Sequence, residues 1–332
     1  MTVMIEALGV SKHYPMETGG FLRRISTPLR AVDDVSLAVM EGETLGLVGE
    51  SGCGKSTLGR LLIRLLPVTA GAIQFGGADI TSLSGKALRD VRRSMQIIFQ
   101  DPYGALNPRM TVEDIIMEPL LIHGARANAD SQARVSEMLS LVGLPVRARE
   151  RFPHEFSGGQ RQRIGIARAL VLRPKFVVCD EPVSALDVSV QAQIVNLLQD
   201  LQGELGLTYL FIAHDLGVVK HISTRVAVMY LGKVVEVAEK RTLYAKPMHP
   251  YTQGLIASVP VTHPAQRRRG STARQRLAGD IPSALHPPPG CRFHTRCPHV
   301  MPVCREQEPA VSAPEPGHWV SCHLMEVKPV SK

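Results

Sequence analysis

The stretch that decides the fold is Gly49-Glu50-Ser51-Gly52-Cys53-Gly54-Lys55-Ser56-Thr57, which matches the pattern G-x-x-x-x-G-K-[ST] of phosphate-binding loops. The apolar run Thr44–Val48 precedes this loop and favours a strand, and a helical pattern follows it through Leu66. Glycines let backbone N–H groups turn inward around phosphates, and the start of a helix adds partial positive charge. The sequence therefore predicts a phosphate site between this strand and this helix, rather than an ordinary glycine-rich turn.

Two side chains of the loop have specific expected roles. We expect Lys55 to neutralise the β- and γ-phosphates of a nucleotide, and the Ser56 hydroxyl to ligate Mg²⁺. Cys53 occupies a variable position of the pattern and is assigned no redox role. The expected nucleotide contacts of the loop are Gly49, Ser51, Gly52, Cys53, Gly54, Lys55, Ser56 and Thr57.

Two further apolar runs end in polar residues. Phe176–Cys179 precedes Asp180 and Glu181, and Tyr209–Ala213 precedes His214. Ligands of open α/β sheets bind at the carboxyl ends of strands, so all three runs point at one site. We expect Asp180 to hold Mg²⁺ through water and Glu181 to polarise the water that attacks the γ-phosphate. Without the phosphate loop, the two acids would be better explained as a helix N-cap.

The alternation of strand and helix patterns predicts an α/β domain built on a mainly parallel sheet. Residues 101–160 are dominated by helical patterns such as Ser131–Leu141, and we expect them to form a helical subdomain. After about Lys246 proline becomes frequent, so regular structure should become sparse. We therefore predict one domain over residues 1–245 and a small irregular region over residues 246–332.

The composition is that of a globular protein, with 44% hydrophobic and 20% charged residues. No stretch approaches the roughly 18–20 apolar residues of a membrane span, and the N-terminus lacks the pattern of a secretion signal. These features predict an intracellular protein. Much of the net charge of +8 lies in one short stretch, formed by Arg267, Arg268, Arg269, Arg274 and Arg276. We interpret this stretch as a solvated basic linker, and contact with lipid headgroups or with a partner is the alternative.

The motif Phe156-Ser157-Gly158-Gly159-Gln160 resembles the L-S-G-G-Q signature of ABC ATPases, with Phe in place of the usual Leu. Other motifs of that family follow in its order. Gln100 resembles the Q-loop glutamine, Ser184-Ala185-Leu186-Asp187 the D-loop, and His214 the switch histidine. The resemblance covers roughly residues 1–245 and implies the fold of an ABC cassette, a P-loop NTPase of RecA-like type.

The resemblance also implies ATP and Mg²⁺ as cofactors and a head-to-tail dimer with ATP between two ATPase subunits. The signature of one subunit would contact the ATP on the phosphate loop of the other, through Ser157, Gly158, Gly159 and Gln160, with Asp187 of the D-loop nearby.

Individual roles follow from the same resemblance. Glu181, His214 and Lys55 would be catalytic, and Gln100 would contact Mg²⁺ and carry the change to membrane subunits. Tyr14 resembles the aromatic residue that stacks on adenine. It lies 35 residues before the loop, and the segment Met16–Arg30 resembles an insertion.

Within the family, four features resemble the ATPases of dipeptide and oligopeptide importers: Gly49–Arg60, Gln100–Pro108, His249–Thr252 and a terminal group of cysteines. This implies a peripheral subunit that powers peptide import at the cytoplasmic face of the inner membrane. The implied partners are a second ATPase subunit, usually a paralogue, two transmembrane permease subunits and an extracytoplasmic peptide-binding protein. Nickel, glutathione and murein peptides are alternative cargoes.

Two other classes fit less well. Soluble ABC ATPases of translation or DNA repair usually carry two cassettes or a long coiled coil, whereas this chain has one cassette and no heptad run, so we expect no nucleic-acid partner. A regulatory subunit that binds ATP without turnover is disfavoured because Glu181 and His214 are both present.

Four of the six cysteines lie within the last 42 residues, with the spacing C-x5-C-x6-C-x17-C: Cys291, Cys297, Cys304 and Cys322. Free thiols favour apolar interiors, so four of them in a poorly hydrophobic tail suggest a metal that substitutes for packing. Zinc sites more often use cysteines two to four residues apart, and the resembling importer ATPases share this pattern, so a [4Fe–4S] cluster is expected with zinc as the alternative. Unliganded cysteines are the third possibility.

Overall fold

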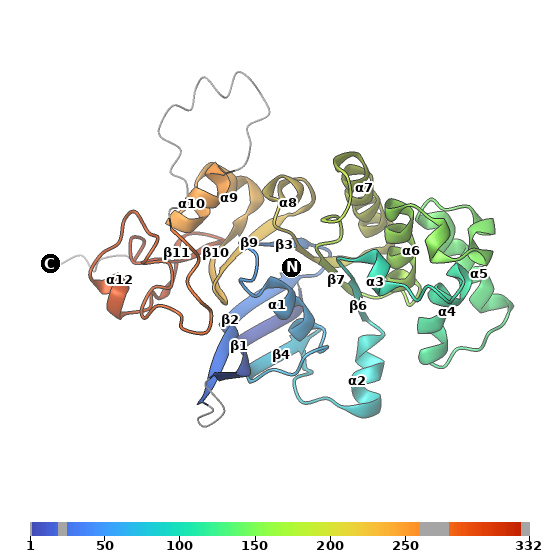
Figure 1. Cartoon of the computed structure of the whole chain (residues 1–332), viewed down its shortest axis with the longest axis horizontal. Coiled ribbons are helices and arrows are strands. Elements are labelled where there is room, and N and C mark those ends of the chain that lie inside the picture. The colour runs from blue at the N-terminus through green and yellow to red at the C-terminus, as the bar shows by residue number, and fades with distance from the viewer. Residues whose placement is uncertain (1, 19–24, 259–278, 327–332) are drawn as a thin grey trace, which may run out of the picture.

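The structure, a computed structural model, describes residues 2–18, 25–258 and 279–326. A four-stranded antiparallel sheet has the order β2-β1-β4-β5, and an eight-stranded mixed sheet has the order β11-β12-β10-β9-β3-β8-β7-β6 (Figure 1). The strands are β1 (Val3–Thr18), β2 (Ile25–Met40), β3 (Thr44–Val48), β4 (Ala70–Phe75), β5 (Ala78–Asp79), β6 (Met95–Ile98), β7 (Phe176–Asp180), β8 (Thr208–Ile212), β9 (Arg225–Tyr230), β10 (Lys233–Glu239), β11 (Val311–Glu315) and β12 (His318–Ser321).

The centre of the larger sheet is parallel, as predicted. β3 pairs with β8 on one side and with β9 on the other, and β7 pairs with β8 and β6. The run predicted at Thr44–Val48 is β3, and the two later runs are β7 and β8 with shifts of one residue at their ends. The carboxyl ends of β3, β7 and β8 therefore lie at one edge of the sheet.

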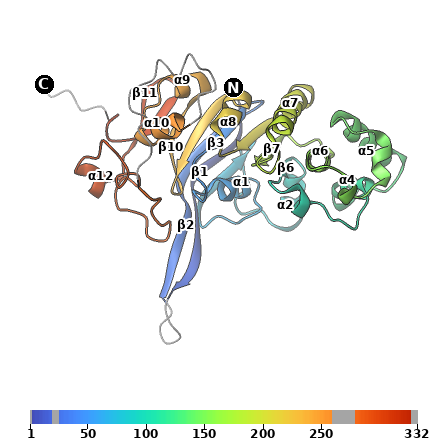
Figure 2. The ribbon, with the colours of Figure 1, turned by 45° about the horizontal axis from the view of Figure 1, so that its top comes forward.

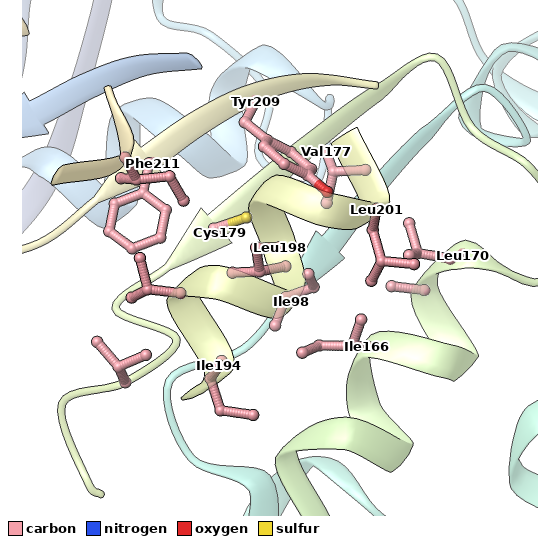
Figure 3. Packing of buried hydrophobic residues seen from close by; sticks show 14 of the residues in the cluster. Ile98, Ile166, Leu170, Val177, Cys179, Ile194, Leu198, Leu201, Tyr209 and Phe211 are labelled. Atoms are coloured by element: carbon pink, nitrogen blue, oxygen red, sulfur yellow. The ribbon is translucent and has the colours of Figure 1, made fainter. Parts of the chain in front are cut away.

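These central strands are buried on both faces, and alternate residues enter two separate cores. On β7, Val177 and Cys179 face a cluster that includes α6 and α7, while Phe176 and Val178 face a second cluster with α1 and the antiparallel sheet. Figure 3 shows the first cluster between the sheet and the two helices, with Ile98, Ile166, Leu170, Val177, Cys179, Ile194, Leu198, Leu201, Tyr209 and Phe211 labelled.

The helices cover the sheets and form most of the segment between β6 and β7. They are α1 (Lys55–Leu62), α2 (Gly85–Arg92), α3 (Pro102–Ala105), α4 (Val112–Ile122), α5 (Ala129–Leu141), α6 (Gly158–Leu170), α7 (Val188–Leu205), α8 (Leu216–Ile222), α9 (Lys240–Ala245), α10 (Pro250–Ala257) and α12 (Val303–Glu306), with the 3-10 turns η1 (Val146–Glu150) and η2 (Pro153–Glu155). All of residues 101–160 are described and none lies in a strand, as expected for the helical subdomain. Of the helices in the described ranges, none is long and apolar enough to cross a membrane.

The helix after the phosphate loop is shorter than predicted. α1 ends at Leu62, and Arg64 has φ 58°, a left-handed conformation that a continuing α-helix does not allow. The prediction of a helix through Leu66 is therefore wrong by about one turn: Ile63 and Leu66 pack on the second core cluster, but they do so beyond the end of the helix.

The segment that resembled an insertion, Met16–Arg30, contains the outer ends of a long hairpin. β1 continues to Thr18 and β2 starts at Ile25, with Tyr14 opposite Leu29. Figure 2 shows the two arms projecting together from the body of the molecule. The additional residues in the described arms lengthen two paired strands.

The C-terminal region is sparse in regular structure, as predicted, but it joins the cassette sheet. β12 pairs antiparallel with β10, with Glu236 opposite Val320 and Val237 opposite Trp319, and β11 pairs with β12. Tyr251 and Phe293 enter the first core cluster. The basic stretch with Arg267, Arg268, Arg269, Arg274 and Arg276 lies outside the described residues.

A buried carboxylate anchors this region to the sheet. Glu236 on β10 accepts hydrogen bonds from the backbone N–H groups of Met248 (2.7 Å) and His249 (3.0 Å), and its Oε1 lies 2.7 Å from His318 Nε2. The side chains of Glu236 and His318 are at most 1% exposed. One side chain thus ties β10 to the start of α10 and to β12.

We predict that Glu236→Leu lowers the free energy of unfolding by about 3 kcal/mol, because it leaves two buried N–H groups and a buried imidazole without their acceptor. Urea unfolding of the full chain measures this. Glu239→Gln, at the exposed end of the same strand, is the control and should change it by about 0.5 kcal/mol or less. A change below about 1 kcal/mol for Glu236→Leu would contradict the anchoring role.

Candidate active site

The phosphate loop connects β3 to α1 and requires glycine at two places. Gly54, the N-cap of α1, has φ 109°, and a Cβ there would lie 2.1 Å from the Ala31 carbonyl oxygen on β2. Gly49 has φ 154°, and a Cβ there would lie 2.1 Å from the Met229 carbonyl oxygen on β9. The loop is therefore packed against both sheets at positions where no side chain fits.

The other loop residues differ in their exposure. Ser51 and Gly52 are exposed at the tip, and Thr57 is half-buried in the first turn of α1. Cys53 is buried, and burial raises the pKa of its thiol. Lys55 is 4% exposed, and its Nζ donates to the carbonyl oxygens of Gly49 (2.8 Å) and Glu50 (3.0 Å).

Ser56 in the first turn of α1 and Asp180 at the carboxyl end of β7 lie side by side at the same edge of the sheet. The Ser56 hydroxyl donates to Asp180 Oδ1 at 2.6 Å, and the Asp180 residue is only 2% exposed. A hydroxyl and a carboxylate are oxygen ligands of the kind that Mg²⁺ prefers, so this pair fits the expected metal. Arg60 of α1 lies 3.4 Å from Asp180 Oδ2, a contact that the motif did not predict.

Two predicted residues, Gln100 and His214, converge on one carboxylate oxygen of a third, Glu181. Gln100 Nε2 donates to Glu181 Oε2 at 3.2 Å, and His214 Nδ1 lies 3.2 Å from the same oxygen. Glu181 has φ 47°, a left-handed conformation that is unusual for glutamate and is typical of functional sites. Its backbone N–H donates to the Ile212 carbonyl at the end of β8, which holds this turn against the sheet.

The signature motif starts α6. The Ser157 side chain accepts a hydrogen bond from the Gln160 N–H, and Gln160 Oε1 accepts from the Ser157 N–H at 3.0 Å, which is a capping box. Ser157 is exposed, and Gly159 packs so closely on α7 that a Cβ would lie 2.5 Å from Val190. Asp187 caps α7 by accepting from the Val190 N–H at 3.0 Å. In the described part of the chain, no hydrogen bond joins these residues to the phosphate loop.

Tyr14 lies on the hairpin near the loop. It pairs with Leu29, two residues along β2 from Ala31, whose carbonyl limits the space at Gly54. The ammonium of Lys12 lies 5.2 Å from the centre of the Tyr14 ring. The backbone of the hairpin thus reaches the loop at Ala31, while the ring of Tyr14 contacts Lys12.

The four C-terminal cysteines are free thiols that lie near one another. Burial raises the pKa of Cys291 and of Cys322 to about 11, and neighbouring cysteines of the group add to both shifts. The Cys291 N–H donates to the Cys304 carbonyl at 2.9 Å. At neutral pH, the raised pKa values keep Cys291 and Cys322 protonated in the metal-free chain, and a metal would have to displace these protons.

Within the three described ranges, no three or more His, Cys, Asp or Glu side chains are arranged to hold a metal ion. The structure thus does not support the expected iron–sulfur or zinc site at Cys291, Cys297, Cys304 and Cys322. The tail was expected to need a metal because it has little means of building its own core, and the structure packs it on the core of the cassette instead. Cys291 and Cys297 contact the first core cluster, and Cys322 packs with Met248 and Val320.

Comparison with known proteins agrees with this geometry. A family profile described as ABC transporter matches residues 32–184, and one described as oligopeptide/dipeptide transporter, C-terminal region, matches residues 235–304. The oligopeptide transport ATP-binding protein AppF of Bacillus subtilis is 54% identical over 324 residues, which cover 97% of both chains.

Two solved structures share the fold. The ATP-binding cassette MJ0796, solved as a dimer bound to ADP and Pi, has a TM-score of 0.63 and 30% identity over 72% of this chain and 99% of its own. The cbiO1 protein of Clostridium perfringens, part of the cbiONQ transporter complex, has a TM-score of 0.64 and 26% identity over 74% of this chain and 92% of its own. The protein therefore has the ABC cassette fold and belongs to the ABC transporter ATP-binding proteins that carry the oligopeptide/dipeptide transporter C-terminal region.

Proposed function

We propose that this chain binds MgATP at the loop between β3 and α1 and hydrolyses it to power peptide import. The observation that carries the proposal is the convergence of Gln100 and His214 on Glu181, next to the Ser56–Asp180 pair. A carboxylate held by two polar side chains beside a phosphate loop suits an attack by water on a γ-phosphate.

The chemistry follows from these positions. Glu181 orients a water and takes its proton as the water oxygen attacks the γ-phosphorus, and the bond to the β-phosphate oxygen breaks to release ADP. Lys55 and the loop amides stabilise charge on the phosphate oxygens. His214 contacts the γ-phosphate from the end of β8. Mg²⁺, held by Ser56 and Asp180 with Gln100 alongside, would neutralise the β- and γ-oxygens.

The signature motif completes the site of a second ATPase subunit in this proposal. Its support is the start of α6, where Ser157 is exposed. In the described part of the chain, Ser157, Gly158 and Gly159 make no hydrogen bond with the phosphate loop of the same subunit. The dimeric form of the similar cassette MJ0796 is a further support. We propose a head-to-tail dimer, with a paralogue as the usual second subunit and Asp187 near the interface.

The proposed cargo and partners rest on the named relatives. AppF is an oligopeptide transport ATP-binding protein, and the C-terminal profile is that of oligopeptide and dipeptide transporters. We therefore propose two permease subunits and an extracytoplasmic peptide-binding protein as partners, with this chain bound at the cytoplasmic face of the inner membrane. Nickel, glutathione or murein peptide import would use the same ATPase chemistry.

A metal at the four cysteines is a separate and narrower proposal. Its structural support is that the free thiols are close neighbours: Cys297 and Cys304 raise the pKa of Cys291, and these three cysteines raise the pKa of Cys322. Binding a [4Fe–4S] cluster or zinc there would require the side chains to move closer together and lose their protons.

We predict that Glu181→Gln slows phosphate release by about 10²–10⁴-fold while nucleotide binding persists, because the amide keeps its hydrogen bonds but accepts no proton. Lys55→Ala should instead weaken nucleotide binding. Phosphate release and nucleotide titration measure the two effects, with Glu204→Gln on the exposed face of α7 as the control. Full activity in Glu181→Gln would remove this residue from the mechanism.

A second prediction concerns the dimer. When one chain carries Ser157→Arg and its partner carries Lys55→Ala, both changes fall on the same ATP site, so one site stays intact and hydrolysis continues. When one chain carries both changes, both sites are damaged. ATPase rates of dimers assembled from differently tagged chains measure this. A faster rate for the doubly changed chain paired with wild type would contradict the head-to-tail arrangement.

A third prediction tests the metal. Protein purified without oxygen should contain iron and sulfide in about equal amounts, or zinc, and should lose them when the four cysteines are changed to Ser. Elemental and sulfide analysis decide between iron and zinc. If the wild-type protein contains no metal and the variant with four serines stays folded, the proposed metal site is wrong and the cysteines are packed thiols.

A further inference from the structure

The phosphate loop is held by two residues from the C-terminal region. The backbone N–H of Glu50, the second residue of the loop, donates to the Tyr251 hydroxyl at 2.9 Å. The Glu50 carboxylate accepts two hydrogen bonds from the Arg296 guanidinium, at 2.7 and 3.0 Å. Tyr251 and Arg296 both lie beyond residue 246, and neither was predicted to take part in the site.

The ion pair between Glu50 and Arg296 is largely buried and bidentate, which fixes its geometry. The Arg296 side chain is 4% exposed and the Glu50 side chain 20%, so solvent competes little for either group. Two parallel hydrogen bonds fix the orientation as well as the distance of a carboxylate. Arg296 also donates to the Tyr230 hydroxyl at 3.4 Å, and its hydrogen bond with Glu50 raises its pKa. The guanidinium is thus held from two sides.

Tyr251 is equally fixed. It is fully buried, and its ring lies 4.7 Å from Tyr230 and 5.5 Å from Phe293, centre to centre. Its N–H donates to His249 Nδ1 at 3.0 Å, and burial lowers the pKa of His249 to about 3, so this ring is a neutral acceptor at pH 7. The start of α10 and the aromatic rings around it therefore fix the position of the Tyr251 hydroxyl, which accepts the hydrogen bond from the Glu50 N–H.

Holding Glu50 also holds the loop lysine. Lys55 Nζ donates to the carbonyl oxygens of Gly49 and Glu50, which belong to the same first turn of the loop. A shift of the Glu50 peptide would displace these two carbonyl oxygens, and it would reorient the backbone N–H groups of the loop residues after Glu50. A phosphate site made of backbone N–H groups depends on such an orientation, since its affinity comes from groups already in place.

We propose that Arg296 and Tyr251 are positioning residues that preorganise the phosphate loop, so that the C-terminal region sets nucleotide affinity. They act through Glu50 and do not touch the nucleotide. This inference rests on the proposed function, because it assumes that the loop binds MgATP. It assigns to the C-terminal region a direct part in the ATP site.

The test measures MgATP binding and turnover with the purified full chain. Arg296→Met should weaken MgATP binding about 10-fold, the scale of one lost charged hydrogen bond, with kcat at saturating ATP within about twofold of wild type. Tyr251→Phe removes only the hydroxyl and should weaken binding about threefold. This variant keeps the test valid if Arg296→Met fails to fold.

A double-mutant cycle separates positioning from general destabilisation. If Arg296 acts through Glu50, Glu50→Gln combined with Arg296→Met should bind MgATP no more weakly than Arg296→Met alone. Additive losses would overturn the proposed route. Arg296→Lys should restore binding in part, because it keeps the charge without the paired donors.

Arg292→Met is the matched control. Arg292 comes from the same segment, is buried, pairs with Asp33 and donates to the Leu231 carbonyl, and in the described ranges no hydrogen bond or ion pair joins it to Glu50 or Lys55. It should lower thermal stability and leave the MgATP dissociation constant within about twofold. Equal weakening by Arg292→Met, or none by Arg296→Met and Tyr251→Phe, would overturn the proposal. Wild-type protein that fails to bind MgATP would refute the proposed function instead.

Discussion

Parallel pairing of β3, β8 and β7 is the constraint on which the site depends. It brings the carboxyl ends of three strands to one edge, so that the phosphate loop, the Asp180–Glu181 pair and His214 meet although they are far apart in the chain. The Ser56–Asp180 hydrogen bond and the contacts of Glu181 follow from that alignment. Burial of the strands on both faces leaves only this edge for chemistry.

The C-terminal region is part of the cassette in physical terms. β12 extends its sheet, Glu236 anchors it through three hydrogen bonds, and Arg296 reaches the phosphate loop. Packing on an existing core explains how a proline-rich segment with little core of its own is ordered. A substitution at Arg296 is therefore expected to change the affinity of the phosphate loop for MgATP.

Local patterns in the sequence predicted the central strands and the helical subdomain, and they singled out Gln100, Glu181 and His214 without predicting that they contact one another. They did so because continuous apolar runs and family motifs are local signals. The longer hairpin and the β10–β12 pairing were missed, since strand pairing over long separations leaves no local pattern. The bond between Glu50 and Arg296 spans 246 residues, and nothing near Arg296 marks it apart from the adjacent Cys297.

The most direct test of the central claim is phosphate release from ATP by the purified chain, with Mg²⁺ present and after Mg²⁺ is removed by EDTA. The arrangement of Ser56, Asp180 and Glu181 predicts release that saturates with ATP and disappears with EDTA. Release at the same rate after metal removal, or none with Mg²⁺ at concentrations where the chain is dimeric, would contradict it.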